Sequence, residues 1–404
     1  DVDAAIAGAE QVLEAEYLFP YLAHAPLEPL DGVIEWRDGK AEVWMGSQLQ
    51  TVDHNTMAAV LDIDAANIAI HTMFAGGSFG RRAQPGGDFA AEVAQVAKVG
   101  GDGAYKLLWT REDDIKGGFY RPLTVHRLRA GLDAQGRIVG WENTIANQTI
   151  MGGTPFEGFM RDGIDPTAVE GARKMPYAWP ANRVAWVPMD SPVSVLWWRS
   201  VGHTHTAYAT ETFLDELLAA GGQDPISGRL ALMKPGFERL AGALEKVAEL
   251  ADWKGPKGSD GRAFGVAAHK SFDSYVATIA EVSDDEGVPK VHRVWCAIDC
   301  GVAINPNVIR AQIEGGIGYG LSAAMFNEVT LAEGGDIEQQ NFDTYRLLRI
   351  DEMPAIEVAV VQSSEAPTGV GEPGLPPLAP AVANAYRVLT GKTPRRLPFS
   401  RLTA

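Results

Sequence analysis

The most constraining feature of the sequence is a glycine-rich run between a strand pattern and a helix pattern. Residues 68–74 (IAIHTMF) are mainly apolar, residues 75–87 (AGGSFGRRAQPGG) contain five glycines, and a helix capped by Asp88 is predicted next. Glycine tolerates left-handed backbone and lets main-chain N–H groups come close to a ligand. A strand, a glycine loop and a helix in this order indicate a mixed α/β region with a candidate anion site.

Strand and helix patterns also follow one another over the rest of the chain. A hairpin is predicted at residues 33–44, where Asp38-Gly39 is a two-residue turn signal. Helical spacing occurs at residues 53–61, 206–218, 226–233, 238–253, 306–325 and 379–390. Strand patterns occur at residues 105–110, 126–132, 137–145, 184–189, 275–282, 291–298 and 356–362.

The length of the chain allows more than one domain. Its 404 residues, 46% of them apolar, are enough for two or three domains with a large core. The segment GPKGSDGR at residues 255–262 is the strongest linker candidate. We therefore predict an α+β chain of two mixed α/β domains, residues 1–254 and 255–404, with the functional site at their interface.

Charge narrows the choice of partners. The net charge of −17 repels a nucleic-acid backbone and anionic membrane surfaces, so no nucleic-acid partner is expected. Two basic pairs, Arg81-Arg82 and Arg395-Arg396, stand out from this acidic background. Each pair is interpreted either as part of an anion site or as ordinary surface charge.

Cysteine and histidine usage argues against a metal held by this chain. Cys296 and Cys300 are the only two cysteines, fewer than the four thiolates of a conventional iron–sulfur cluster. Their spacing in a strand pattern predicts two buried, unpaired thiols. The eight histidines show no zinc-type spacing. The sequence also contains no signal-peptide pattern and no apolar run of membrane-spanning length.

The glycine-rich run supports three interpretations. Backbone N–H groups at residues 77–80 and the guanidinium groups of Arg81 and Arg82 would suit the pyrophosphate of a dinucleotide. The same run spells G-x-S-x-G, the elbow of a serine hydrolase, with Ser78 as nucleophile and one base chosen from His203, His269 and His292. Residues 81–87 separate Ser78 from the next helix, which disfavours the elbow. The third interpretation is a purely structural turn.

Glu372 is the strongest candidate for an acid–base group. It lies between glycine and proline in VGEPGLPP, residues 370–377, directly before a predicted helix. Burial of a carboxylate in such a rigid turn raises its pKa, which suits a general base. Taken alone, the segment is better explained as a helix-entry loop than as a catalytic site.

Three more polar residues lie where a ligand site is expected. Arg199 follows two tryptophans and precedes His203 at a predicted helix start, where helix N–H groups and a guanidinium suit an anionic or carbonyl oxygen. Gln312 lies on a helix that runs into two glycines, and Gln48 follows a predicted strand end. Each signal is weak by itself.

Taken together, these motifs resemble the molybdenum-binding large subunits of the xanthine oxidase and aldehyde oxidoreductase family, in the branch of the isoquinoline 1-oxidoreductase beta subunits. The matching segments are AEYLFPYLAHAPLEP, GGSFGRR, LLWTREDD, WWRSVGHTH, ETFLDELL, DCGVAINPNVIRAQIEGGIGYGLSAA and VGEPGLPPLAPAVANA. The resemblance implies two molybdopterin-binding domains and a molybdenum held by the dithiolene of a molybdopterin cytosine dinucleotide, without a protein ligand to the metal.

The resemblance also implies roles for individual residues. The catalytic set would be Glu372 as the base, Gln48 on the oxo side of the metal, and Arg199. The cofactor would be bound by Gly77, Ser78, Phe79, Gly80, Arg81, Arg82, Arg199, Ser271, Phe272, Ser274, Gln312 and Gly371. Ser78 and Asp273 stand where the family commonly has glycine, which alters loop shape or substrate choice and removes no group that the mechanism needs.

Finally, the resemblance implies partners and a reaction. Family members carry a further upstream portion, so we expect that part as a separate chain or a cleaved half, together with a subunit holding 2Fe-2S clusters and, in some relatives, a cytochrome c. The implied reaction oxidises an aldehyde or an N-heteroaromatic carbon with water as the oxygen source, in the periplasm, at a membrane-associated complex or in the cytoplasm. A non-catalytic scaffold and a serine hydrolase using Ser78 are the alternatives.

Overall fold

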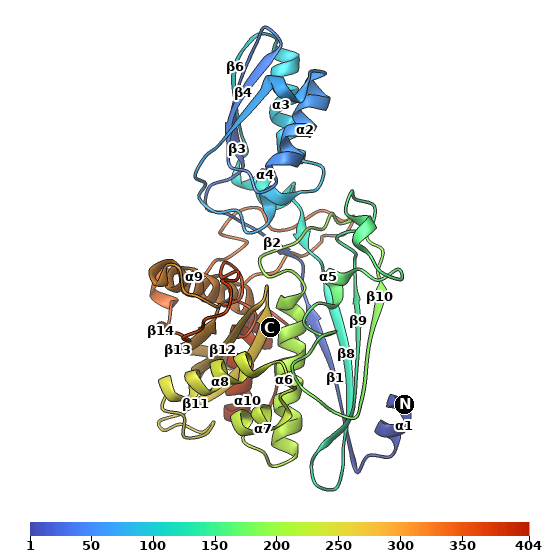
Figure 1. The fold of residues 1–404 in the computed structure, drawn as a ribbon, viewed down its shortest axis with the longest axis vertical. Helices are drawn as coiled ribbons and strands as arrows, with labels where there is room; N and C mark the ends of the chain where they lie inside the picture. Colours follow the sequence, from blue (N-terminus) through green and yellow to red (C-terminus); the bar gives the residue numbers. More distant parts are fainter. Residues whose placement is uncertain (404) are drawn as a thin grey trace.

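The computed structural model describes residues 1–403. It consists of a small upper lobe and a larger body in which two four-stranded sheets lie on either side of packed helices (Figure 1). Strand order in the three large sheets is β5-β4-β3-β6, β1-β8-β9-β10 and β11-β12-β13-β14, and each sheet contains both parallel and antiparallel neighbours. The predicted α+β class of fold is confirmed.

The small lobe contains the glycine-rich run. Its sheet consists of β3 (Asp31–Arg37), β4 (Lys40–Met45), β5 (Ile68–Thr72) and β6 (Gly103–Leu108), and it packs against α2 (Gln50–Leu61) and α3 (Asp88–Gly100). The predicted hairpin at residues 33–44 is confirmed, because Asp38 (φ 48°) and Gly39 (φ 70°) form a two-residue turn of left-handed backbone between β3 and β4.

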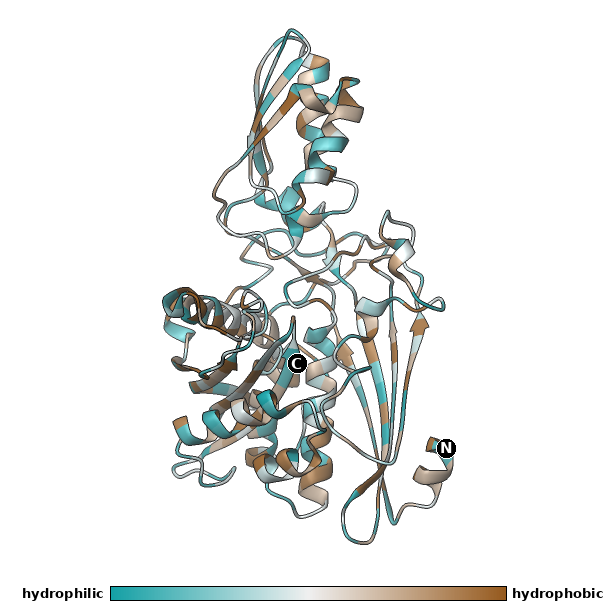
Figure 2. Cartoon of the chain, viewed as in Figure 1, coloured by the Kyte–Doolittle hydropathy of each residue, from teal (hydrophilic) through white to brown (hydrophobic). Residues whose placement is uncertain are grey.

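The two sheets of the body share one core. The first contains β1 (Gln11–Phe19), β8 (Thr124–Leu132), β9 (Ile138–Asn147) and β10 (Ala181–Pro188). The second contains β11 (Arg262–Ser271), β12 (Ser274–Asp285), β13 (Val288–Asp299) and β14 (Ala355–Val360). Helices α6 (His203–Ala220) and α10 (Leu378–Thr390) pack between them. Figure 2 shows hydrophobic and hydrophilic residues alternating along β8 and β9, in line with one buried face.

The other helices cover this body and connect its parts. They are α1 (Val2–Ala7), α4 (Arg111–Lys116), α5 (Pro166–Val169), α7 (Pro225–Leu232), α8 (Glu238–Leu250) and α9 (Pro306–Met325), and a short pair, β2 (Leu22–Ala23) with β7 (Tyr120–Arg121), lies below the small lobe. Helices α7 and α8 pack on the second sheet of the body, although they precede it in the chain. Residue 254 lies in the loop between α8 and β11, and the division into domains there stays a proposal.

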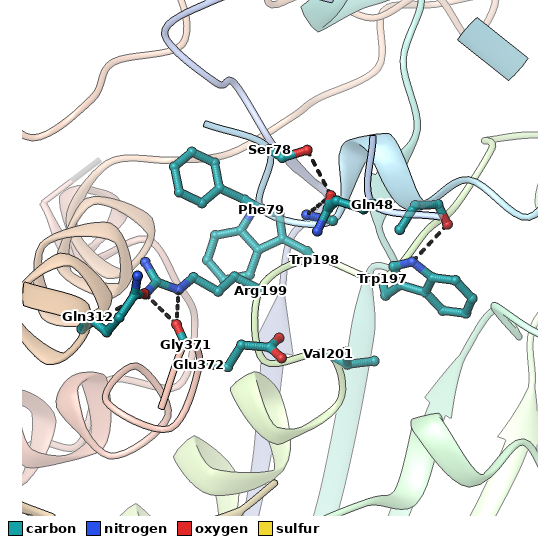
Figure 3. Close-up of a pocket in the computed structure, with 12 residues that line it drawn as sticks. Gln48, Ser78, Phe79, Trp197, Trp198, Arg199, Val201, Gln312, Gly371 and Glu372 are labelled. Carbon is teal, nitrogen blue, oxygen red and sulfur yellow. Dashed lines mark hydrogen bonds between the residues drawn. The ribbon is translucent and has the colours of Figure 1, made fainter. Parts of the chain in front are cut away.

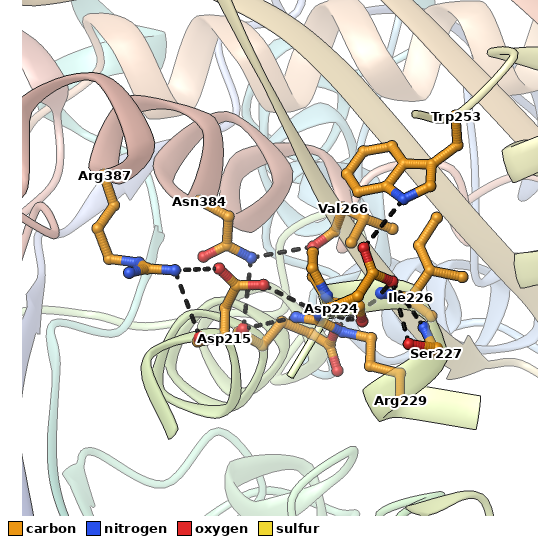
Figure 4. Close-up of polar contacts among 12 residues, drawn as sticks. Asp215, Asp224, Ile226, Ser227, Arg229, Trp253, Val266, Asn384 and Arg387 are labelled. Atoms are coloured by element: carbon orange, nitrogen blue, oxygen red, sulfur yellow. Dashed lines mark hydrogen bonds and ion pairs between the residues drawn. The ribbon is translucent and has the colours of Figure 1, made fainter. Parts of the chain in front are cut away.

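A buried ion-pair network joins three of these helices (Figure 4). Arg229 of α7 is fully buried, and its guanidinium contacts Glu211 at 2.9 Å and Asp215 at 3.0 Å, both on α6. Asp215 also accepts a hydrogen bond from Arg387 of α10 at 2.6 Å. Each carboxylate therefore has a cationic partner, as buried charges require.

The structure corrects one detail of the sequence interpretation and bears out another. Asp88 does not cap its helix, since Gly87 is the cap residue and Asp88 is the first helical residue, with its carboxylate 2.6 Å from Arg81. Cys296 and Cys300 are both buried and free, as predicted. Among residues 1–403, no helix combines the length and the apolar character needed to cross a membrane.

Candidate functional site

A cavity of about 450 Å³ opens where the small lobe meets the body, a size typical of ligand sites (Figure 3). Four separate segments and one helix line it: the loop between β4 and α2, the glycine-rich run, the loop before α6, the loop before α10, and α9. The lining residues are Gln48, Ser78, Phe79, Gly80, Ala83, Trp197, Trp198, Arg199, Val201, Gln312, Gly371 and Glu372. All three predicted catalytic residues are among them.

The glycine-rich run bends sharply at the cavity wall. Phe79 has φ 55° and Gly80 has φ 110°, and a Cβ atom on Gly80 would lie 2.3 Å from the carbonyl oxygen of Trp197. Only glycine fits there. Gln48 holds the turn, because its Oε1 accepts hydrogen bonds from the Ser78 hydroxyl (2.7 Å) and from the Gly80 N–H (3.2 Å).

Arg199 connects three of the segments (Figure 3). Its backbone N–H donates to the carbonyl of Phe79 at 2.9 Å, and its Nε donates to the carbonyl of Gly371 at 2.8 Å. Its Nη2 donates to both oxygens of Gln312, the carbonyl and Oε1, at 3.2 Å each. The guanidinium therefore fixes the loop of the predicted base relative to α9.

Glu372 lies beside Arg199 and is bound by the loop that precedes α6. Its Oε1 accepts from the Ser200 N–H at 2.8 Å, and the Ser200 hydroxyl donates to the Glu372 carbonyl at 2.8 Å. Ser200 (φ 75°) and Val201 (φ 49°) adopt left-handed backbone, which non-glycine residues rarely do. Burial raises the pKa of Glu372, and the Ser200 N–H and the Arg199 charge offset part of that rise.

The two arginines of the glycine-rich run lie behind the cavity wall. Arg81 is buried and pairs with Asp88 at 2.6 Å, while Arg82 donates to the carbonyl of Gly77 at 2.5 Å. Neither side chain lines the cavity. Nε and Nη2 of Arg82 have no hydrogen-bond partner among residues 1–403, and contact of the two guanidiniums with an anion stays a prediction. In the other basic pair, Arg395 forms an ion pair with Glu216 and Arg396 forms one with Glu328.

The predicted segment at residues 271–274 is the turn between β11 and β12. Phe272 (φ 49°) and Asp273 (φ 58°) take left-handed backbone, which explains why glycine would also suit position 273. Ser274 donates to the carbonyl of Gly369 at 2.6 Å, three residues before Glu372. Gly77, Ser271, Phe272 and Ser274 do not line the cavity, so the turn reaches it only through the 369–372 loop.

An aromatic stack and a second carboxyl were missed by the sequence analysis. The Tyr319 ring stacks on Phe79 (centroids 4.2 Å apart) and on Trp198 (4.6 Å), and its hydroxyl donates to the carbonyl of His24 at 2.7 Å. Glu170 accepts from the Gly202 N–H at 2.8 Å, close to Glu372. Tyr319 lies among the small residues of α9 and could have been noticed there. No local pattern marks Glu170.

The hydrolase interpretation lacks its base. The Ser78 hydroxyl donates to an amide oxygen of Gln48, and within residues 1–403 no histidine is hydrogen-bonded to it. His203 and His269 are bonded to each other, and His292 is bonded to Ser283. Because a serine nucleophile needs a base within hydrogen-bond reach, this arrangement disfavours Ser78 as a nucleophile.

The fold and the cavity define a cofactor-binding α/β protein. Two family models, each described as a molybdopterin cofactor-binding domain, match residues 1–232 and 235–354. The chain therefore belongs to the molybdopterin cofactor-binding family, and its predicted resemblance to the xanthine oxidase family is confirmed.

Relatives of known name support this assignment. The chain is 32% identical over 410 residues to the beta subunit of isoquinoline 1-oxidoreductase from Brevundimonas diminuta, covering 98% of this chain and 51% of that protein. It is 28% identical to a protein of Gluconacetobacter polyoxogenes named membrane-bound aldehyde dehydrogenase [pyrroloquinoline-quinone] (98% of this chain, 54% of that protein). A nicotinate dehydrogenase subunit from Pseudomonas putida is also 28% identical (99% and 35%). The chain thus spans about half the length, or less, of these relatives.

Solved structures share the fold at low sequence identity. Quinoline 2-oxidoreductase from Pseudomonas putida 86 superposes with a TM-score of 0.83 at 12% identity, covering 98% of this chain and 76% of that one. Aldehyde oxidoreductase from Desulfovibrio gigas gives a TM-score of 0.77 at 16% identity, covering 100% and 62%. At these identities the likeness establishes the fold.

Proposed function

We propose that this chain is the cofactor-binding portion of a molybdenum hydroxylase large subunit, which oxidises an aldehyde or an N-heteroaromatic carbon with water as the oxygen source. The observation that carries the proposal is the partly buried Glu372 carboxylate at the wall of a cavity shared with Arg199, Gln312 and Gly371. Relatives named as isoquinoline, nicotinate and aldehyde oxidoreductases support the same class of substrate.

The residues around the cavity fit a molybdopterin. At Gly371, the nearest atom to an added Cβ would be Gln312 Oε1 at 4.0 Å, so glycine leaves open space beside a hydrogen-bonding amide. Residues 77–80, Gln312 and Gly371 would hold the cofactor, with Gln48 toward the metal. The residues at 81–82 and 271–274 would shape the loops that reach it. When bound, the cofactor would supply the redox chemistry and the transferred oxygen.

Glu372 would act as the general base. It takes up a proton when it is ionised, and its raised pKa makes it a stronger base than an exposed glutamate. The Ser200 N–H aims one carboxylate oxygen, and Arg199 fixes the loop on the other side, so the base is held ready rather than recruited on binding.

Finer features of the complete enzyme are proposed on the same basis. We infer a cytosine dinucleotide form of the cofactor and a partner with 2Fe-2S clusters as electron acceptor. A cytochrome c as final acceptor and a periplasmic or membrane-associated complex are consistent with this proposal. Two of the relatives are themselves named as subunits.

The test is the composition of the purified native complex and of its Glu372→Gln variant. We expect about one molybdenum and one CMP per chain in both proteins, since glutamine keeps the acceptor for the Ser200 N–H, and a loss of turnover of at least about 10²-fold in the variant. If the native complex contains neither molybdenum nor CMP while its partners are present, the proposal fails and a scaffold role replaces it. Retention of most activity by Glu372→Gln would refute the assigned base.

A further inference from the structure

A second carboxyl, Glu170, is bound by the same loop that binds Glu372. Glu170 follows α5, and its Oε1 accepts from the Gly202 N–H at 2.8 Å, just as Glu372 Oε1 accepts from the Ser200 N–H at 2.8 Å. The loop lies in close contact with α5, since a Cβ on Gly202 would lie 1.9 Å from the carbonyl oxygen of Thr167. The two carboxyls therefore accept hydrogen bonds from backbone N–H groups that lie two residues apart in the chain.

Glu170 also begins a line of polar groups that leads away from the cavity. Its Oε2 lies 3.6 Å from Nε2 of His203, and Nδ1 of His203 lies 2.8 Å from Nε2 of His269. The two rings are packed against Gly171, where a Cβ would lie 2.9 Å from His203 Nδ1 and 2.8 Å from His269 Cε1. Glycine at 171 is thus required for this pair of imidazoles to stand next to the carboxyl.

The groups that surround Glu170 favour the protonated form of its carboxyl. His203 is buried, which lowers its pKa to about 4 and keeps the ring neutral, so that one nitrogen donates and the other accepts. The other facing charges are Glu372 and Asp165, and no cation among residues 1–403 pairs with Glu170. Burial first, and then these carboxylates, raise the pKa of Glu170 to about 8, although its exposed fraction of 26% weakens that effect.

We propose that Glu170 is a positioning and proton-transfer partner of Glu372, and that His203 and His269 extend it into a chain that carries a proton from the cavity to solvent. This inference rests on the function proposed above, in which Glu372 is protonated once per turnover. Glu170 acts through Glu372 and does not line the cavity.

The transfer balances without any added reactant. No direct hydrogen bond joins the two carboxyls among residues 1–403, so protonated Glu372 gives its proton to a bridging water, which passes one of its own protons to Glu170. The proton that Glu170 already carries passes to Nε2 of His203 when these two atoms, 3.6 Å apart in the structure, close to hydrogen-bond distance. The proton on Nδ1 of His203 passes to Nε2 of His269, and Nδ1 of His269 releases one proton to water, to which this residue keeps 6% exposure. Glu372 ends as a carboxylate, Glu170 ends protonated, and both imidazoles end neutral in the other tautomer. No electrons move.

The first experiment needs no cofactor. In the full chain labelled with ¹³C at glutamate Cδ, the resonance that disappears in Glu170→Gln should titrate above pH 7, well above the usual value of about 4.3 for glutamate. The resonance assigned by Glu372→Gln should titrate differently when Glu170 is replaced, because neighbouring carboxyls titrate as a pair. A Glu170 resonance with an ordinary titration, or a Glu372 titration unaffected by Glu170→Gln, would overturn the proposal.

The second experiment uses the native complex over pH 6–9. Glu170→Gln and His269→Gln should each lower kcat about tenfold or more at unchanged KM and unchanged molybdenum content, and the alkaline limb of the pH profile should disappear in Glu170→Gln. The matched control is His126→Gln, which changes a second buried pair, His126 Nε2 to His205 Nδ1 at 2.8 Å, that ends on Asn143 instead of a carboxyl. An unchanged kcat and pH profile in Glu170→Gln refutes the chain.

The two failures are distinguishable. A complex without molybdenum removes the proposed function and leaves the carboxyl titration to be explained, whereas a loaded complex with an ordinary Glu170 titration removes only the proton chain. Thermal unfolding of each variant checks that it is folded. If Glu170→Gln does not fold, His269→Gln tests the same kcat loss, because it breaks the chain at its outer end.

Discussion

At Gly80 the absence of a side chain determines how closely the small lobe approaches the body. The backbone there has φ 110°, and the space that a Cβ would need contains the carbonyl of Trp197. The same residue donates its N–H to Gln48, so a shift of Gly80 also moves a residue that lines the cavity. The approach of the small lobe to the body and the position of Gln48 at the cavity therefore both depend on the absence of a Cβ atom at Gly80.

The variant Gly80→Ala should lose both stability and cofactor. Strained left-handed backbone and the collision with a main-chain oxygen together should lower the free energy of unfolding by about 2–4 kcal/mol, measured by chemical denaturation. Gly86→Ala in the same run is the control, because its Cβ would meet only the flexible Gln84 amide, 3.2 Å away. Equal stability and molybdenum content in the two variants would contradict the close approach assigned to Gly80.

Single residues of the site were predictable to different degrees. Gln48, Arg199 and Glu372 could be found because they lie at a predicted strand end, before a predicted helix start and in a glycine–proline loop. Gln312 could be found because its predicted helix runs into two glycines, and the structure gathers all four around one cavity. The direction of a guanidinium has no sequence signal. Arg81 and its neighbour turn inward because Asp88 and a carbonyl are within reach there, and only the three-dimensional arrangement reveals it.

Among the elements, α6, α7 and α10 are joined by charge as well as by apolar packing. Arg229 is completely buried between Glu211 and Asp215, and their charges raise the pKa of its guanidinium against the effect of burial (Figure 4). Glu211 also accepts from the Ala268 N–H of β11 at 3.0 Å. The network thus ties α6, α7 and α10 to the sheet that contains β11.

Removal of Arg229 should be among the most destabilising single changes in this chain. Arg229→Ala leaves Glu211 buried without its cation, and we expect the free energy of unfolding to fall by about 3–5 kcal/mol in urea titrations. Arg137→Ala is the matched control, since Arg137 pairs with Asp133 on an exposed turn and its side chain is 71% exposed; such pairs contribute at most about 1 kcal/mol. Similar losses for the two variants would show that the buried network is not a main source of stability.

Elements with strong periodicity were predictable, and those specified by tertiary pairing were not. The helix predicted at residues 306–325 matches α9, because Asn305 caps it, Pro306 begins it and its apolar spacing is regular. Strand β1 escaped prediction, since Gln11–Glu14 begin it with mostly exposed side chains and its pairing with β8 determines its course. Asp88 was predicted to cap its helix because aspartate is common at helix starts. In the structure its carboxylate forms an ion pair with Arg81 instead.

On the scale of the whole molecule, the cavity belongs to no single part of the chain. Gln48 and Ser78 come from the small lobe, Arg199 from the loop before α6, and Glu372 from the loop before α10. Sequence patterns describe each loop separately and contain no information on their distances. The hydrogen bonds of Arg199 to Phe79 and Gly371 are what assemble them.

Cofactor loading should therefore order distant segments together. In the loaded native complex we expect slower backbone hydrogen exchange at residues 77–80, 199–202 and 369–372 at once, relative to protein prepared without cofactor, because a ligand that binds only the assembled site stabilises every segment that forms it. At a ligand concentration of 100 times Kd this stabilisation amounts to about 2.7 kcal/mol. The turn at residues 133–136, at the far end of β8 and β9, is the internal reference and should be unaffected. Protection confined to one of the three segments would mean that the cofactor binds one loop and that the cavity between them is not its site.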